Sequence, residues 1–128
     1  MPHVLVVTDE TWVANDVRAS LSEPGYSLTE FDDPQSALAA CRTESLDAAV
    51  IDLQVRSMGG MAIVRAIRDI PRPGGARPLP TILLLDRSAD SFLARRAGAG
   101  AWIRKPFTAF ELRDAIEGLL DGEDQARE

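Results

Sequence analysis

Short apolar runs of strand length recur along the chain, separated by longer segments of mixed polarity. Three runs, Val4–Val7, Ala48–Ile51 and Thr81–Leu85, do not alternate with polar residues, and two weaker runs lie at Tyr26–Phe31 and Ala101–Ile103. A strand that is covered on both faces shows this unbroken pattern, because neither face meets water. The runs therefore predict the strands of a parallel sheet with helices on both sides.

The segments between the runs have the apolar period of amphipathic helices. Their apolar positions are Val13, Val17 and Leu21; Pro34, Ala37, Leu38 and Cys41; Gly60, Ile63, Val64 and Ile67; and Leu112, Ala115, Ile116 and Leu119. Asp33 is a suitable N-cap for the second helix, with Pro34 at the first helical position. Thr108 and Glu111 form a capping box before the last helix. A shorter helix is expected near Ala89–Arg96.

Strands that alternate with helices predict a (βα)5 chain of the α/β class. In 128 residues this order corresponds to a flavodoxin-like, doubly wound, five-stranded parallel sheet with strand order 2-1-3-4-5. We expect one domain over residues 1–120 and an acidic, frayed tail or linker start over residues 121–128. The stretch PRPGGARPLP, residues 71–80, predicts an exposed loop in which Arg72 and Arg77 are solvated.

Composition and charge narrow the classes of function. The chain is 45% hydrophobic, enough for one core, and its formal net charge is -6. An acidic chain lacks the basic face that nucleic acids require, so we expect protein partners and no direct contact with nucleic acid. The single cysteine, Cys41, forms no intramolecular disulfide and suits the reducing cytoplasm. Neither a signal peptide nor a stretch of membrane-spanning length is recognisable, so we expect a cytoplasmic protein without membrane contact.

Charged residues follow the predicted strands at one edge of the sheet. Asp9 follows the first strand, Asp52 the third and Lys105 the fifth. Ligands bind beyond the carboxyl ends of such strands, where the strand order reverses. Two neighbouring carboxylates need a cation between them, and oxygen ligands of this kind suit Mg²⁺. A carboxylate can also attack phosphorus, in which case a metal and a lysine neutralise the transferred oxygens.

Three stretches, VLVVTDE, DAAVIDLQVRSMGGMAIVRAIR and AGAGAWIRKPF, resemble a known family. Over nearly its whole length the chain is similar to the response-regulator receiver domains of bacterial two-component signalling. The resemblance implies that Asp52 is the phosphoacceptor and that Lys105 binds the phosphoryl group. It implies that Asp9, Asp52 and the backbone carbonyl of Gln54 hold Mg²⁺. The implied donor is a histidine kinase or a phosphotransfer protein.

The resemblance has further implications away from the phosphoacceptor. A cis peptide bond is expected between Lys105 and Pro106. Trp102 matches the aromatic residue that moves on activation, although a packed edge residue is an equal alternative. Signalling is expected through protein contacts, including a homodimer through the face of the fourth helix, fifth strand and fifth helix. Such a domain is not an enzyme and at most dephosphorylates itself slowly.

Three residues at the ends of the strands depart from the pattern of the family. Thr8 stands where a second acid is usual, so we expect weak Mg²⁺ binding. Leu85 stands in place of the Thr or Ser that hydrogen-bonds the phosphoryl group, with Ser88 as a substitute hydroxyl if the loop folds back. Asp86 replaces a small residue, and we favour a helix cap for it over a ligand role. These departures indicate an atypical receiver.

Two hypotheses of different class follow. In the first, the chain is a receiver that is phosphorylated on Asp52 with Mg²⁺. In the second, it is a pseudo-receiver that binds partners or a second copy without phosphorylation, which Thr8, Leu85 and Asp86 favour. A hydrolase with a D-x-D nucleophile is disfavoured because Gln54 replaces the second acid. A dinucleotide or P-loop site is also disfavoured, since neither glycine-rich motif is present.

Overall fold

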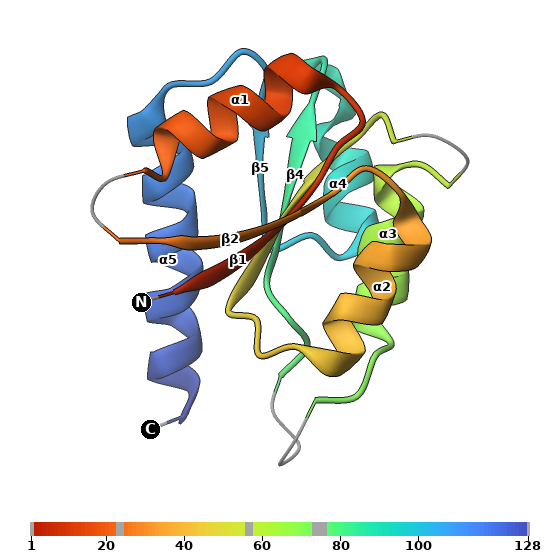
Figure 1. The fold of residues 1–128 in the computed structure, drawn as a ribbon, viewed down its shortest axis with the longest axis vertical. Coiled ribbons are helices and arrows are strands. Elements are labelled where there is room, and N and C mark those ends of the chain that lie inside the picture. Colours follow the sequence, from red (N-terminus) through yellow and green to blue (C-terminus); the bar gives the residue numbers. More distant parts are fainter. Residues whose placement is uncertain (1, 23–24, 56–57, 73–76, 128) are drawn as a thin grey trace.

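A parallel β-sheet forms the middle layer of the fold (Figure 1). The computed structural model describes residues 2–22, 25–55, 58–72 and 77–127, with the backbone alone for 122–127. Within these residues the sheet has five strands: β1 His3–Val7, β2 Ser27–Phe31, β3 Ala48–Asp52, β4 Thr81–Leu85 and β5 Ala101–Arg104. Their order is β2-β1-β3-β4-β5 and every pair is parallel. The predicted fold class and strand order are confirmed.

Helices cover both faces of the sheet, as predicted from the unbroken apolar runs. The described helices are α1 Thr11–Ser20, α2 Pro34–Thr43, α3 Gly60–Arg68, the short 3-10 helix η2 Ser88–Asp90, α4 Ser91–Ala97 and α5 Ala109–Arg127. One face of the sheet packs against α1 and α5, and the other packs against α2, α3 and α4 (Figure 1). Parallel strands need such crossovers, and because each crossover is right-handed, the side on which the next strand is added decides which face the helix covers.

Successive side chains of β4 show how the core divides into two clusters. Leu83 and Leu85 pack in the cluster under α2, α3 and α4, whereas Ile82 and Leu84 pack in the cluster under α1 and α5. All five residues of β4 are buried. Because side chains of a strand alternate between faces, an apolar run without polar interruption is required here.

The helix caps lie where the sequence places them. The Asp33 carboxylate accepts a hydrogen bond from the Ser36 amide at 2.9 Å, and Pro34 is the first helical residue of α2. The Thr108 hydroxyl accepts from the Glu111 amide, and the Glu111 carboxylate accepts from the Thr108 amide, both at 3.1 Å. Both caps satisfy amides that have no partner within the helix.

The structure differs from the sequence-based expectation mainly at element ends. The short helix expected near Ala89–Arg96 is divided into η2 and α4. The backbone of α5 stays helical to Arg127, beyond the expected boundary at residue 120, although Asp121, Gly122 and Asp124 are weak helix formers. The proposed division into a domain and a tail stays a prediction, and residues 73–76 and 128 lie outside the described residues. In the described part of the chain, no helix combines the length and apolarity needed to span a membrane.

Candidate functional site

Asp52 is the last residue of β3 and its side chain is fully buried. Its Oδ1 accepts hydrogen bonds from the Lys105 ammonium and, at 3.2 Å, from the Gln54 amide. Its Oδ2 accepts from the Thr8 hydroxyl at 2.8 Å. A buried carboxylate is stable only with such partners, because it loses its hydration. The sheet therefore brings residues 8, 52 and 105 to one point at its carboxyl edge.

Thr8 directly follows β1 and lies beside Asp52 because Val7 pairs with Ile51 in the parallel register. Its hydroxyl oxygen accepts from the Glu10 amide at 3.1 Å and donates to Asp52. The amide occupies an acceptor position of the oxygen, so the hydroxyl proton is oriented toward the carboxylate. Thr8 supplies one directed donor to Asp52, at the position where the resemblance led us to expect an acid.

Lys105 follows β5, and its side chain is only 5% exposed. Its backbone amide donates to the Leu85 carbonyl at 2.8 Å, and the expected cis bond to Pro106 is present. The ammonium contacts Asp52 and, at 3.0 Å, Asp86. Burial alone would lower the pKa of Lys105, but the hydrogen bonds and charges of Asp52 and Asp86 outweigh burial and raise it. Lys105 is therefore a cation at neutral pH.

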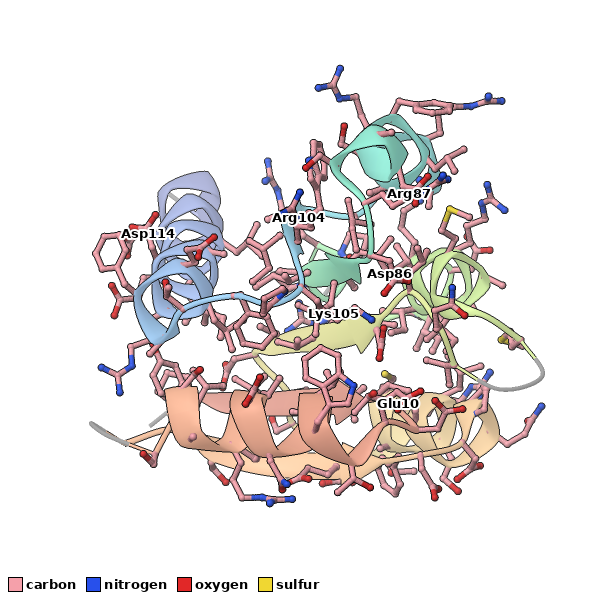
Figure 2. The ribbon with its side chains drawn as sticks, turned by 90° about the horizontal axis from the view of Figure 1, so that it is seen from above. Glu10, Asp86, Arg87, Arg104, Lys105 and Asp114 are labelled. Atoms are coloured by element: carbon pink, nitrogen blue, oxygen red, sulfur yellow. The ribbon has the colours of Figure 1, made fainter. Side chains whose placement is uncertain are left out.

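Asp86 is not the helix cap that the sequence suggested. The cap position of η2 is Arg87 and that of α4 is Asp90, so Asp86 lies too early in the chain to cap either helix. Instead it extends from the end of β4 to Lys105, and its side chain is 42% exposed. Figure 2 looks onto this edge, where Asp86 and Lys105 lie near each other. Asp86 is therefore the second carboxylate that pairs with the Lys105 ammonium, after Asp52.

Asp9 lies beside Asp52's neighbour Thr8 and is half-buried. With Glu10 and Asp32 it lines a hollow of about 370 Å³ between β1, α1 and the end of β2. Among the described residues, no three His, Cys, Asp or Glu side chains are placed to hold one metal ion. Mg²⁺ does not need three, since it takes one or two carboxylates and fills its other positions with water. Carboxylate oxygens such as those of Asp9 and Asp52 are the type of ligand that suits this ion, and their joint binding of Mg²⁺ stays a prediction.

The sequence matches one family over most of its length. The family model described as response regulator receiver domain covers residues 4–117. The chain belongs to this family. The probable transcriptional regulatory protein TcrX of Mycobacterium tuberculosis is 33% identical over 119 residues, which are 91% of this chain and 49% of that protein. Transcriptional regulatory protein CseB of Streptomyces avermitilis is 32% identical over 120 residues, 92% of this chain and 48% of that protein.

Solved structures give the same result at the level of the fold. NtrX from Brucella abortus superposes with a TM-score of 0.84 at 27% identity, over 99% of this chain and 28% of that one. The receiver domain of the sensor histidine kinase PA1611 from Pseudomonas aeruginosa has a TM-score of 0.82 at 24% identity, over 94% of this chain and 98% of that one. That structure has a magnesium ion in its active-site cleft. This receiver spans about half the length of the curated relatives named above.

Leu85 and Trp102, the two residues expected to mediate switching in the receiver, are not among the hydrogen-bond partners described for Asp52. Leu85 ends β4 and packs in the apolar core, with 1% of its surface exposed. Trp102 on β5 is partly buried against the same core cluster, and the Arg95 guanidinium lies 5.6 Å from the centre of its ring. This packing is compatible with the role of a packed residue on the edge strand. Movement of Trp102 on activation stays a prediction.

Sequence reasoning missed two contacts of the receiver site. It did not predict that the Thr8 hydroxyl donates to Asp52. The role of Ser88 as a substitute for the hydroxyl missing at Leu85 stays a prediction. Sequence reasoning also missed the contact between Asp86 and Lys105. The signal was available in the register, because Thr8 and Asp86 each follow a strand that neighbours β3 in the sheet.

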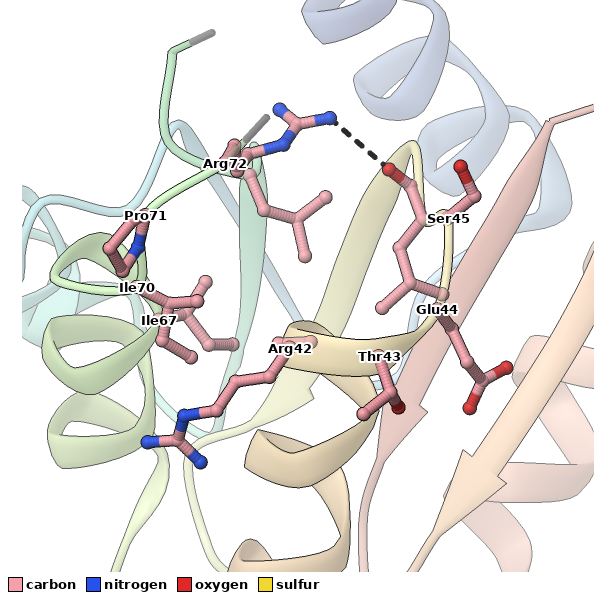
Figure 3. A pocket seen from close by; sticks show the side chains of 11 residues that line it. Arg42, Thr43, Glu44, Ser45, Ile67, Ile70, Pro71 and Arg72 are labelled. Carbon is pink, nitrogen blue, oxygen red and sulfur yellow. Dashed lines mark hydrogen bonds between the residues drawn. The ribbon is translucent and has the colours of Figure 1, made fainter. Parts of the chain in front are cut away.

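A cavity at the opposite edge of the sheet corrects one further expectation. It has a volume of about 290 Å³ and lies between the end of α2 and the segment after α3 (Figure 3). Arg72, expected to be solvated, is half-buried, and its guanidinium donates to the carbonyls of Leu46 at 3.3 Å and Arg77 at 2.9 Å. Arg72 thus joins its loop to the start of β3, far from Asp52.

Proposed function

We propose that this receiver accepts a phosphoryl group on Asp52 from a histidine kinase or phosphotransfer protein. The observation that supports the proposal best is the Asp52 carboxylate at the end of β3, in contact with both the Lys105 ammonium and a hydroxyl donor. In the transfer, an Asp52 oxygen forms a bond to phosphorus while the bond from phosphorus to the donor histidine nitrogen breaks. The nitrogen keeps the electron pair and takes up a proton. Lys105 stabilises the charge on the transferred oxygens.

Mg²⁺ is the cofactor that we propose for this step. Asp9, Asp52 and the backbone carbonyl of Gln54 would hold it, and the bound ion would supply positive charge to the phosphoryl oxygens. Thr8 contributes no charge where the family usually has an acid, so this ion is held weakly. The chain itself positions Asp52 through the Thr8 hydroxyl and the Gln54 amide.

We further propose that the receiver signals through protein contacts in the cytoplasm rather than through nucleic acid. A net charge of -6 supports this view for the chain itself. The face of α4, β5 and α5 is the proposed site of a partner or of a homodimer, and α4 carries an exposed aromatic residue, Phe92, which is 55% exposed. The domain is a signalling domain. The one reaction that we propose it catalyses is the slow hydrolysis of its own phosphoryl group.

Intact-mass spectrometry tests the phosphoacceptor directly. The protein is incubated with acetyl phosphate and Mg²⁺, and we expect one added phosphoryl group in the wild type and none in Asp52→Asn. Asp69→Asn, which changes an exposed acid after α3, is the matched control and stays modified. Chelation of Mg²⁺ is expected to abolish the adduct. An adduct that survives Asp52→Asn contradicts the proposal.

A pseudo-receiver remains the second candidate, and one observation favours it. Asp52 is fully buried and Lys105 already contacts a second carboxylate, Asp86. The charge of Lys105 is already balanced by carboxylates, so the site is stable without a phosphoryl group. In this case Asp52→Asn retains partner binding and cellular function. Loss of both in a folded Asp52→Asn protein contradicts the second candidate.

A further inference from the structure

Lys105 joins two carboxylates that differ in accessibility. Asp52 is fully buried, whereas the Asp86 side chain is 42% exposed. Both contact the same nitrogen, through Asp52 Oδ1 and through Asp86 Oδ1 at 3.0 Å. The two carboxylate oxygens therefore lie close to one another and are held together by the one ammonium between them. Asp86 is the partner that can leave, because water can replace Lys105 around an exposed carboxylate.

Phosphorylation of Asp52 would change the charges that surround the Lys105 ammonium. A phosphoryl group carries about -1.5 to -2 charges, compared with one for the carboxylate that it modifies. This added charge would appear beside Lys105 and therefore beside Asp86. Like charges at this separation repel, and the Lys105 ammonium would be attracted more strongly to the more highly charged anion.

The segment after Asp86 leads directly to α4. Arg87 follows Asp86, and its guanidinium pairs with Asp90 at 3.1 Å. Asp90 ends η2 and immediately precedes α4. A backbone movement at Asp86 would therefore reach the short, ion-paired segment at the start of α4 within a few residues. Leu85, which lacks a hydroxyl, offers no polar alternative for this coupling.

We propose that Asp86 is a built-in competitor of the phosphoryl group for Lys105, and that its release signals phosphorylation to η2 and α4. In the unmodified chain Asp86 neutralises Lys105 and slows phosphorylation of Asp52. In the modified chain the phosphoryl group takes its place and Asp86 turns to solvent. This inference rests on the proposed function. It assigns to Asp86, just after the end of β4, the coupling between phosphorylation and α4 that Leu85 cannot provide without a hydroxyl.

Asp86→Asn tests the competition, since it removes the charge and keeps the shape. We expect Asp52 in this variant to be phosphorylated by acetyl phosphate about tenfold faster than in the wild type, the size of a partly screened charge effect. Asp69→Asn, which changes an exposed acid outside this segment, is expected to leave the rate unchanged. Asp86→Ala provides a second variant without the charge. Rates in both Asp86 variants at or below that of the wild type overturn the proposal.

Amide chemical shifts test the release. We expect residues 87–97 of unmodified Asp86→Asn to shift toward the positions that beryllofluoride induces in the wild type. We expect the Asp90→Asn protein to show a smaller beryllofluoride response in α4. Beryllofluoride shifts confined to the residues around Asp52 also overturn the proposal.

Titration with inorganic phosphate separates this inference from the proposed function. If neither protein is phosphorylated, tighter phosphate binding by Asp86→Asn at Lys105 still supports competition, although the phosphoacceptor role has failed. If both proteins are phosphorylated at the same rate, the phosphoacceptor role stands and the competition is refuted. Equal phosphate affinity in the two unphosphorylated proteins refutes it as well.

Discussion

Thr8 and Asp52 show how a single hydroxyl supports a buried charge. The Thr8 proton points at Asp52 because the same oxygen already accepts the Glu10 amide. With Lys105 and the Gln54 amide on the other carboxylate oxygen, Asp52 has polar partners on both sides. Removal of any one of them leaves part of a buried charge without compensation.

Thr8→Val tests the contribution of this hydroxyl, because it preserves the side-chain shape and removes the donor. We expect the free energy of unfolding to fall by about 1.5–3 kcal/mol, the usual range for a hydrogen bond to a charged group. Urea denaturation measures the change. Thr8→Ser keeps the hydroxyl and serves as the control, with a smaller loss. Equal stability of the valine variant and the wild type would show that the hydroxyl contributes nothing to Asp52.

Cys41 provides a prediction that concerns pH. Burial raises the pKa of its thiol to about 11, since a thiolate is poorly solvated on the inner side of α2. The thiolate is the reactive form, so alkylation by iodoacetamide at pH 8 is expected to be at least about tenfold slower than in the urea-unfolded chain. The rate should keep rising with pH up to about 11. A rate that levels off near the ordinary thiol pKa contradicts the assignment.

At the scale of elements, two glycines in helices have opposite environments. A Cβ at Gly60, the first residue of α3, would lie 2.2 Å from the Asp52 carbonyl oxygen and 2.8 Å from the Leu53 Cα. These are backbone atoms that cannot yield, so Gly60 permits α3 to begin against the end of β3. A Cβ at Gly118 in α5 would meet nothing within 4 Å.

Alanine at these two positions is therefore expected to act in opposite directions. Gly118→Ala should raise the free energy of unfolding by about 0.5–1 kcal/mol, because alanine loses less backbone entropy in a helix. Gly60→Ala should lower it, because the close approach to β3 must open. Urea denaturation of the two variants measures both signs. Stabilisation by Gly60→Ala would contradict the packing described for the start of α3.

The elements could be predicted from the sequence where local physics decides them. Thr81–Leu85 has the predicted bounds of β4, since an uninterrupted apolar run ends sharply at Asp86. The caps at Asp33 and Thr108 could be predicted for the same reason, because their partners lie three residues away. Local pattern does not fix where a helix ends, and α5 continues well past the position expected from its apolar face.

At the scale of the whole molecule, one sheet joins two separate apolar clusters. Leu83 and Leu84 are sequence neighbours in β4, yet they pack on opposite faces. Both are at most 1% exposed. Because the sheet belongs to both clusters, loss of either cluster removes the support of the other.

Leu83→Ala and Leu84→Ala are expected to be similarly destabilising. Each creates a cavity in a packed core and should cost about 2–5 kcal/mol. Urea denaturation followed by far-UV circular dichroism and by tryptophan fluorescence should give coincident transitions in each variant. Separated transitions in either variant would show that the two faces unfold independently.

The candidate site could be predicted only as far as the topology determines it. Strand order alone places Asp52 and Lys105 at one edge, although 53 positions separate them in the chain. For Thr8 and Asp86 the strand order indicates only that both lie at the ends of strands next to β3, whereas their contacts depend on which way short side chains turn there. A hydroxyl or an acid at a strand end has several available partners, including a helix cap, and only the assembled edge selects among them.

The wide separation of Asp52's partners also has a consequence during synthesis of the chain. A ribosome delivers the N-terminus first, so Thr8 and Asp52 emerge long before Lys105. A nascent chain that has formed β1 and β3 holds a carboxylate with its hydroxyl donor and without its cation. Burial of such an unpaired charge is unfavourable, so burial of the Asp52 carboxylate is favoured only once β5 and Lys105 are available. A product released before residue 105 therefore lacks the cation that neutralises Asp52 in the folded chain, so premature termination yields fragments without the contact between Asp52 and Lys105.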